Sequence, residues 1–517
     1  MEQLGGDLET LADLDEDLRI RLVTAAGVLS RPDRYTRKAM AKVQQRAAKA
    51  QKRAADRAVL DQTGIRALRR EPVFRAPLPK PAFQQLDEPV RDDAEADAWA
   101  EAEARREDAG AEDQRRVTDS RMCYVCKTHF NDLHFFYDSM CRPCAELNYR
   151  KREQTADLRG RVVLVTGARV KIGYQAAVKL LRAGAEVIVA TRFPRDAARR
   201  FEMEPDAVEW TRRLHLYGID LRHTPSVERL CQHLLQTCTR LDGIINNACQ
   251  TVRRPSGWYD HVIASELEPP RTPFERAVLD RNHALRGEVD PARLHVGAGS
   301  GTEVATIAGT EIQAAGLWKS AVLSQVPLLA EDLDRGGHLY PEGRLDQDLQ
   351  QVDLRDFNSW RMTLAEVPTA ELFEVHLVNA IAPFVLNARL RPLLAAVPTR
   401  DSHVVNVSAM EGQFYRRWKT DKHPHTNMAK AALNMMTRTS AADYVKDGIH
   451  MNSVDTGWVT DEDPLHHAER KKAVHGFHPP LDIVDGAARI VDPLFDGVNT
   501  GKHVWGVFLK DYKPAPW

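Results

Sequence analysis

The sequence predicts an α/β fold, in which a doubly wound parallel sheet fills roughly the C-terminal two-thirds and follows a helical arm and a small four-cysteine module. Three observations support this organisation. Short β-branched runs alternate with amphipathic segments from Gly160 onward. An Ala-, Lys- and Arg-rich stretch of helical composition precedes them, and two closely spaced cysteine pairs lie between these regions.

Seven short apolar runs are the predicted strands. They are residues 162–165, 187–190, 214–219, 243–245, 404–407, 450–454 and 504–509. Because helical segments separate them, the strands should pair in parallel, with helices on both faces. The alternation stops at about 250–368, which we expect to be an irregular insertion with a few short helices. Ligands bind at the carboxyl ends of such strands, so this insertion should lie near the ligand.

The region before the cysteines is predicted to be a charged helix and a linker. Residues 31–57 contain ten basic residues but only Asp33 and Asp56 as acids, and they are either a solvated, coiled-coil-like arm or a surface for phosphate or a partner. Five prolines in residues 71–89 predict an extended linker. The acidic segment 91–116 is predicted to be a helix. The predicted units are the arm 1–70, the linker and acidic helix 71–118, the cysteine module 119–155, and the α/β domain 156–517 with its insertion.

Composition argues against several classes of protein. The formal net charge of -1 gives no overall attraction to nucleic acid or to an anionic membrane. No apolar run approaches the roughly 18 residues that span a bilayer, and the acidic N-terminus does not resemble a signal peptide. Seven cysteines are too few for a disulfide scaffold in a chain of this length. We therefore expect a cytoplasmic protein without a membrane partner.

The cysteine pattern predicts a structural zinc site. The four cysteines form two CxxC pairs separated by fourteen residues. Each pair places two thiolates on one side of a tight turn, and two such turns complete a tetrahedral site with no open position. His129 and His134 lie between the pairs, but four thiolates already fill the coordination shell, so we expect these histidines to pack in the module. The predicted zinc ligands are Cys123, Cys126, Cys141 and Cys144.

A helix should follow the second cysteine pair and end in the basic sequence NYRKR. Arg150, Lys151 and Arg152 in this sequence have two interpretations. They either bind phosphate or an acidic partner, or they stabilise the C-terminus of the helix through its dipole.

The segment RVVLVTGARVKIGYQAAVKLLRAGAEVIVATR has the order strand, tight turn, helix, strand. Gly167 permits a sharp turn, and Gly173 lets the helix start close to the sheet. The N-terminus of that helix then faces a pyrophosphate, because its free N–H groups and its dipole favour an anion. The segment therefore predicts a dinucleotide site.

Several motifs together resemble the short-chain dehydrogenase/reductase family. TGARVKIG resembles the family's glycine motif, GIDL its adenine-contacting acidic position and NNAC its NNAG, while VNVSA, KAAL and DTGWVT complete the set. Lys171 and Cys249 depart from the family's glycines. The resemblance covers about Gly160 to Tyr512, apart from the insertion. It implies a Rossmann domain, a nicotinamide cofactor, hydride transfer to or from a small-molecule carbonyl or alcohol, and a homo-oligomer.

The resemblance also implies which residues bind the cofactor. Arg192 follows the second strand, where an arginine suits the 2′-phosphate of NADP and a carboxylate would suit NAD, and Arg169 is a possible second cation. NADP is therefore expected in preference to NAD. The predicted cofactor-binding residues are Thr166, Gly167, Arg169, Lys171, Ile172, Gly173, Arg192, Asp220, Asn247, Ala248, Lys430 and Thr460.

The catalytic set matches the family at three of four positions, namely Asn379, Ser408 and Lys430. The tyrosine expected four residues before the lysine is replaced by Thr426, whose hydroxyl is far less acidic than a phenol. Tyr415, in a lengthened loop after Ser408, either replaces that tyrosine or packs under its loop. His423 and His425 are proton carriers of lower rank, because loop histidines are commonly exposed. The predicted catalytic set is Asn379, Ser408, Tyr415 and Lys430.

Two functions follow from these motifs. The first is an NADP-dependent oxidoreductase acting on a carbonyl or alcohol. The alternative is a catalytically degenerate NADP-binding sensor or scaffold that recruits a protein partner through the zinc module or the basic arm. Binding of nucleic acid by the basic helix has weak support, and the sequence does not predict which substrate is used.

Overall fold

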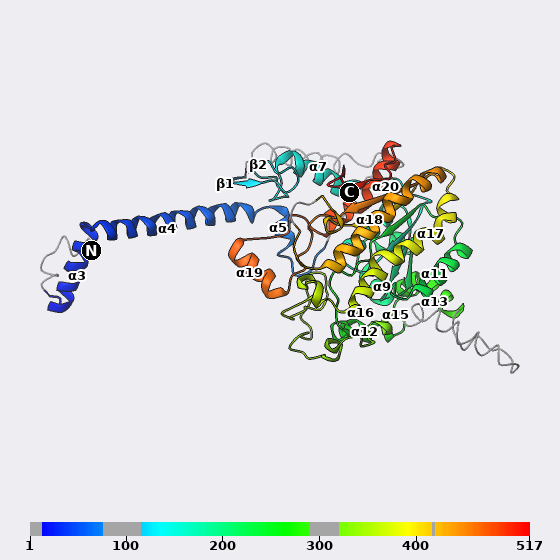
Figure 1. Ribbon diagram of the computed structural model, residues 1–517, viewed down its shortest axis with the longest axis horizontal. Helices are drawn as coiled ribbons and strands as arrows, with labels where there is room; N and C mark the ends of the chain where they lie inside the picture. The colour runs from blue at the N-terminus through cyan, green and yellow to red at the C-terminus, as the bar shows by residue number, and fades with distance from the viewer. Residues whose placement is uncertain (1–12, 76–114, 289–319, 416–418) are drawn as a thin grey trace, which may run out of the picture.

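An eight-stranded sheet forms the centre of the C-terminal region and carries helices on both faces (Figure 1). The computed structural model describes residues 13–75, 115–288, 320–415 and 419–517. The strands lie in the order β10-β9-β8-β7-β6-β3-β4-β5, and every neighbouring pair is parallel except β9 and β10. Their bounds are β3 Val162–Thr166, β4 Glu186–Thr191, β5 Leu214–Gly218, β6 Gly243–Asn246, β7 Ser402–Ser408, β8 Ile449–Asp455, β9 Phe508–Lys510 and β10 Lys513–Ala515. The predicted doubly wound α/β fold is confirmed.

The C-terminal edge differs from the prediction. The expected strand at 504–509 begins only at Phe508, because Gly506 has a φ of 70° that breaks extended backbone. Asp511 and Tyr512 also have positive φ angles, 49° and 65°, and turn the chain back as the antiparallel β10. The sheet therefore has an additional antiparallel edge strand.

Two apolar layers hold the helices against the sheet. On one face of the sheet, the helices contribute Val178, Phe201 and Leu494 to the first layer. On the opposite face, they contribute Leu230 and Leu390 to the second layer. The run Thr369–Ala395 is apolar enough to cross a membrane, but half of its most apolar window is buried in the fold, as expected of a core helix. The helices are α8 Lys171–Arg182, α9 Pro194–Glu202, α10 Ala207–Trp210, α11 Thr224–Thr237, α16 Thr369–His376, α17 Ala382–Ala395, α18 Pro424–Tyr444, α19 Leu465–His475 and α20 Ile483–Thr500, with the π-helical turn η7 Leu377–Ile381 between α16 and α17.

The insertion is more regular than predicted. A helix of sixteen residues, Pro273–Glu288, buries Val278 and Leu279 in the apolar layer that covers β5. A second cluster joins Trp258, Tyr259 and Tyr340 to Phe193, which follows β4. Residues 289–319 lie outside the described residues. The elements are η2 Ser256–Tyr259, α12 Asp260–Leu267, α13 Pro273–Glu288, α15 Ser320–Leu323, η4 Ala330–Leu333, η5 Ser359–Arg361 and η6 Leu364–Glu366.

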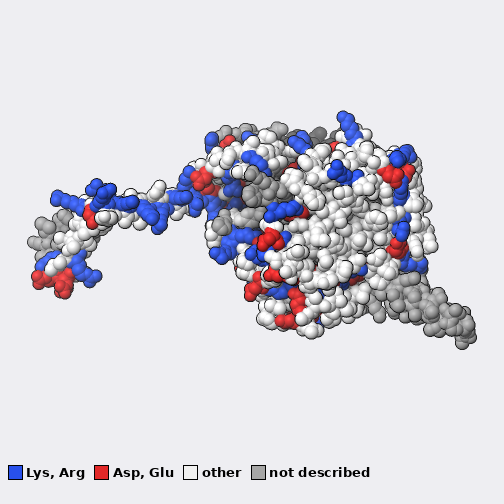
Figure 2. Space-filling view, in the orientation of Figure 1, with Lys and Arg blue, Asp and Glu red and all other residues white. Residues whose placement is uncertain are grey.

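A long basic helix extends away from this body (Figure 1). The helix α4 Arg34–Leu60 lies between α3 Glu16–Ser30 and α5 Gly64–Leu68. It begins where Asp33 accepts a hydrogen bond of 2.6 Å from the Thr36 N–H, and Lys and Arg side chains follow its length (Figure 2). The predicted long helix is confirmed. The acidic helix expected at 91–116 lies outside the described residues as far as residue 114. Its last expected residue, Arg116, begins a strand.

The cysteine module packs directly on the α/β domain. It contains β1 Arg116–Met122, β2 His129–Asp132 and α7 Arg142–Glu153. Buried Arg152 forms ion pairs with Asp482 at 2.6 Å and with Asp485 at 2.8 Å, both at the start of α20. Lys151 pairs with Asp492 at 2.7 Å. Of the two interpretations of these cations, the one in which Lys151 and Arg152 bind phosphate or an acidic partner is therefore disfavoured, because carboxylates of α20 and its N-cap already pair with them.

Candidate functional site

A cavity of about 1800 Å³ opens at the carboxyl ends of the parallel strands. The turn after β3, the ends of β4, β7 and β8, the insertion and the cysteine module all contribute to its walls. The structure therefore brings most of the predicted site into one cavity. The predicted residues that line it are Gly167, Arg169, Lys171, Ile172, Gly173, Arg192, Asp220, Asn247, Ala248, Ser408, Tyr415, Lys430 and Thr460.

The glycine turn is fixed by contacts that tolerate no larger residue. Gly167 has a φ of 69°, and a Cβ there would lie 2.7 Å from the Ala248 Cα. A Cβ on Gly173 would lie 2.2 Å from the Asn247 Nδ2 and 2.5 Å from the Gly167 carbonyl oxygen. Asn247 Nδ2 donates to the Thr166 carbonyl at 3.1 Å, and the Ala248 N–H donates to Thr166 Oγ1 at 3.0 Å. Thr166 thus supports the turn from beneath without lining the cavity.

Lys171 heads the helix that faces the cavity and has a φ of 55°, which explains why the family's motif has a glycine there. Burial alone would lower the pKa of its ammonium, but Glu462, Asp348 and Asp346 together raise it. The side chain is therefore charged at neutral pH. This puts a cation beside the N-terminus of α8, where a cofactor phosphate would bind.

The two arginines expected at the cofactor differ in their partners. Arg169 pairs with Asp196 at 2.6 Å and donates to Gln350 at 2.9 Å, so its charge is already neutralised. Arg192 donates to the Tyr259 hydroxyl at 2.7 Å and lies over the Tyr259 ring. No carboxylate pairs with Arg192 among the described residues. Arg192 is thus the more available of the two cations for an anionic ligand.

Asp220 lines the cavity after β5 but already has a partner. Its carboxylate pairs with Arg222 at 2.7 Å, and Arg222 also bonds to Glu374. Burial alone would raise the pKa of Asp220, but the Arg222 guanidinium holds it below its usual value. The predicted adenine contact would therefore involve a carboxylate that is ionised and held in place.

At the predicted catalytic end of the cavity, a buried polar group lacks a partner among the described residues. Ser408 ends β7 and is 3% exposed, and its Oγ makes no hydrogen bond in the part of the chain that the structure describes. Buried Thr426 Oγ1 also makes no hydrogen bond there, but Thr426 does not line the cavity. Lys430 Nζ donates to the Val407 carbonyl at 2.7 Å, which places it beside Ser408. Buried polar groups normally have partners, so Ser408 Oγ, which lines the cavity, suits a polar ligand.

Asn379 lies behind the cavity wall. It is buried in the π-helical turn η7, where its Oδ1 accepts from the Gln250 N–H at 2.8 Å and its Nδ2 donates to the Gln250 carbonyl at 3.2 Å. Its side chain therefore fixes the loop after β6, and Gln250 rather than Asn379 lines the cavity.

Tyr415 does not hydrogen-bond to Ser408. Its hydroxyl lies 3.8 Å from Met410 Sδ, and the residue is 47% exposed at the cavity mouth. The following residues, 416–418, lie outside the described residues. The phenol would have to turn inward to act on a substrate held by Ser408.

His423 is buried, whereas the sequence had suggested an exposed loop histidine. It is 8% exposed, lines the cavity, and stacks on Trp360 from the insertion with ring centroids 3.9 Å apart. The pKa of His423 is lowered to about 4, mainly by burial and to a smaller extent by the charge of the nearby His425. His425 lies deeper, 3.4 Å from Glu371, and does not line the cavity. The only sequence signal was Pro424, which begins α18 and fixes His423 just before it.

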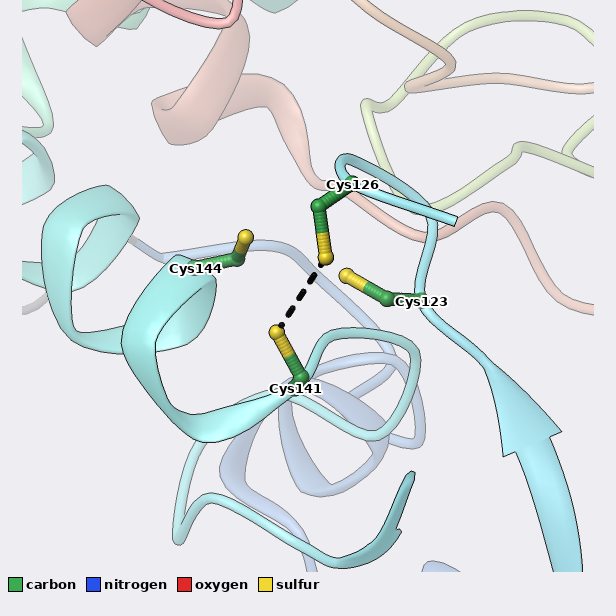
Figure 3. A group of neighbouring side chains, drawn as sticks. All are labelled: Cys123, Cys126, Cys141 and Cys144. Atoms are coloured by element: carbon green, nitrogen blue, oxygen red, sulfur yellow. Dashed lines mark hydrogen bonds between the residues drawn. The ribbon is translucent and has the colours of Figure 1, made fainter. Parts of the chain in front are cut away.

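The four cysteines form a cluster that could hold a metal ion. Their sulfur atoms point toward one another (Figure 3), and all lie within 4.8 Å of each other, with Cys126 and Cys141 3.5 Å apart. A tetrahedral thiolate set suits a soft or borderline metal. Buried His134 accepts hydrogen bonds from the module's backbone at Nδ1, in agreement with the prediction that it is no ligand.

The cysteine module also forms part of the cavity wall. Tyr124, between the first two cysteines, accepts a hydrogen bond of 3.0 Å from the Trp458 N–H. Trp458 follows Gly457, whose φ is 75°, in the segment after β8 that leads to Thr460. No sequence pattern indicated this contact between the module and the segment expected to touch the nicotinamide.

Two family models match the chain, one before and one after the central part of the insertion. The short chain dehydrogenase model matches residues 161–262, and the enoyl-(acyl carrier protein) reductase model matches residues 357–478. Uncharacterized protein R665 of Acanthamoeba polyphaga mimivirus is 28% identical over 74% of this chain and 72% of its own length. Retinol dehydrogenase 14 of Mus musculus is 37% identical over 18% of this chain and 30% of its own length. Dehydrogenase/reductase SDR family member 13 of Bos taurus is 34% identical over 27% of this chain and 40% of its own length.

Among solved structures, a metagenomic short-chain oxidoreductase in complex with NADP is 16% identical over 68% of this chain and 97% of its own, with a TM-score of 0.37. The chain covers less than half of the length of the two dehydrogenases named above. The family-model matches cover the glycine turn and the segment with Ser408 and Lys430, and the fold is the doubly wound sheet that this family requires. The chain therefore belongs to the short-chain dehydrogenase/reductase family of NAD(P)-dependent oxidoreductases.

Proposed function

We propose that the protein uses NADP(H) to transfer hydride between the nicotinamide and a carbonyl or alcohol carbon of a small molecule. The observation that carries this proposal is that the glycine turn, Arg192, Lys430 and an unpartnered Ser408 line one cavity. The cofactor supplies the hydride, and the protein supplies binding, orientation and proton transfer.

The residues around the cavity have distinct proposed roles. The α8 N-terminus and Lys171 hold the pyrophosphate, and Arg192 binds the 2′-phosphate because it has no carboxylate partner among the described residues. Lys430 holds the nicotinamide ribose. Ser408 Oγ positions the substrate oxygen, which would satisfy its missing hydrogen bond. Asn379 acts indirectly by holding Gln250 in the cavity wall.

We assign proton transfer to Tyr415, after its loop turns inward. Its neighbours along the chain, Glu411 and Lys419, line the same cavity, so the loop is anchored on both sides of the catalytic end. His423 is a weaker candidate because a pKa of about 4 makes its imidazole a poor base at neutral pH.

The cysteine cluster fits zinc, and we propose a closed structural zinc site there. Its contact with Trp458 suggests that the module supports the cofactor segment. The seven cysteines are all free, which fits a reducing compartment such as the cytoplasm. A homo-oligomer follows as a proposal from the family.

The proposed function is tested with a panel of aldehydes and ketones in the presence of NADPH, and of alcohols in the presence of NADP. The absorbance of the nicotinamide measures turnover. Tyr415→Phe should lower kcat by about 100-fold or more, because it removes the only proposed phenol. Thr426→Val should leave kcat close to that of the wild type. An unchanged kcat in Tyr415→Phe, or loss of turnover in His423→Gln instead, would refute the assignment of Tyr415.

An NADP-binding sensor without turnover is the second candidate function. It is favoured by Thr426 at the tyrosine position and by the Tyr415 hydroxyl, which hydrogen-bonds to Met410 Sδ and not to Ser408 Oγ. Tight NADPH binding with no reduction of any carbonyl and no oxidation of any alcohol in the panel would support this second function and exclude the first for those substrates.

A further inference from the structure

Three histidines gather at the edge of the sheet opposite the cofactor cavity. His403 lies near the start of β7, His450 near the start of β8, and His503 in the segment that precedes β9. Ser408 ends β7 five residues after His403, which corresponds to roughly 16 Å along an extended strand. None of the three histidines lines the cavity. The cluster is therefore separate from the proposed active site.

The ring nitrogens converge as metal ligands do. One nitrogen from each histidine lies within 4.8 Å of the other two, and His403 Nε2 is 2.9 Å from His503 Nδ1. Nitrogens bound to one tetrahedral zinc ion lie about 3.3 Å apart, given zinc–nitrogen distances near 2.0–2.1 Å. Small ring movements would therefore bring all three nitrogens onto one ion.

Gly497 leaves space beside two of these nitrogens. A Cβ at this position of α20 would lie 2.5 Å from His503 Nδ1 and 3.1 Å from His403 Nε2. A glycine inside a helix costs about 0.5–1 kcal/mol relative to alanine. The helix therefore accepts a less favourable residue where a side chain would fill the histidine cluster.

The surroundings of the rings also suit a metal site. His450 Nδ1 lies 3.3 Å from the Ser402 carbonyl oxygen, which orients the ring and leaves Nε2 as the ligand. His403 is 1% exposed, whereas His450 and His503 are half-buried, so an ion and a water molecule can reach the site. Both oxygens of nearby Asp401 bond to Arg161, so Asp401 is not counted as a ligand.

We propose that His403, His450 and His503 bind a divalent transition-metal ion, with zinc as the expected metal and water as the fourth ligand. Imidazole nitrogen suits zinc and its neighbours in the first transition row. The ion would link β7, β8 and the segment before β9 far from the cofactor, so its role would be structural.

Metal analysis of the full-length protein tests this proposal. After removal of loosely bound metal and addition of zinc alone, the wild type should hold two zinc ions per chain, one at the cysteines and one at the histidines. His503→Gln and Gly497→Ala should each hold one, the latter with all three histidines intact. His338→Gln, which removes an exposed histidine of the insertion, is the matched control and should hold two.

Cobalt distinguishes the two sites spectroscopically. Cobalt at the cysteines should give strong thiolate charge-transfer absorption, while cobalt at the histidines should add only weak visible bands, which His503→Gln removes. Circular dichroism and NADPH binding check that the variants fold. A single zinc in the wild type, or two zinc ions retained in folded His503→Gln, would overturn the proposal.

Discussion

The cofactor end and the catalytic end of the cavity are built differently. At the cofactor end, Gly167, Gly173 and Asn247 are held in a turn by close contacts and hydrogen bonds to the backbone. At the predicted catalytic end, Ser408 Oγ lines the cavity and is buried without a partner among the described residues. An unmade hydrogen bond of a buried group costs about 1–3 kcal/mol. The comparison indicates that the cofactor end is complete in the protein alone, whereas the catalytic end is completed by a ligand.

The largest expected effect comes from breaking the cofactor end. In Gly173→Ala, the new Cβ would collide with Asn247 and with the Gly167 carbonyl, so the turn must open. We expect NADPH affinity to fall by about 100-fold or more, which corresponds to at least about 2.7 kcal/mol. Calorimetric titration measures this loss.

Gly337→Ala is the matched control, because nothing lies within 4 Å of a Cβ at Gly337 and its φ does not demand glycine. It should bind NADPH as the wild type does. If Gly173→Ala keeps wild-type affinity while folded, the turn does not hold the cofactor as described.

A smaller effect concerns the catalytic end. Folded His423 has a pKa of about 4 because it is buried, whereas an unfolded histidine has a pKa near 6.5. As pH falls below about 6.5, the unfolded chain therefore binds a proton that folded His423 does not. His423 should reduce the free energy of unfolding by roughly 1–2 kcal/mol between pH 7 and pH 5.

Urea unfolding at the two pH values tests this prediction. The pH dependence should be weaker in His423→Gln than in the wild type and unchanged in His338→Gln, since His338 is exposed. An identical pH dependence in all three proteins would show that His423 titrates in the folded state as it does in the unfolded chain.

The same contrast separates what the sequence predicted from what it did not. The strand–turn–helix at Gly167 and the pairs of cysteines are local patterns, and the structure places them as expected. The burial of His423 depends on Trp360, which comes from an insertion without a readable pattern. The histidine cluster likewise joins three distant parts of the chain. Such contacts arise from tertiary packing, which local periodicity does not encode.

Some local features were also missed, for identifiable reasons. The final hairpin depends on positive φ angles at Asp511 and Tyr512, and neither residue is a glycine that would signal such a turn. Lys151 and Arg152 were open to two interpretations because their carboxylate partners lie on α20, more than 300 positions later in the chain.

Titration of the purified protein with NADPH and NADH tests the central claim most directly. The account predicts that NADPH binds more tightly, and that Arg192→Ala weakens NADPH binding by roughly 10- to 100-fold while leaving NADH binding unchanged, as expected for loss of a charge-assisted phosphate contact. Binding of neither nicotinamide cofactor to the wild type would contradict the account.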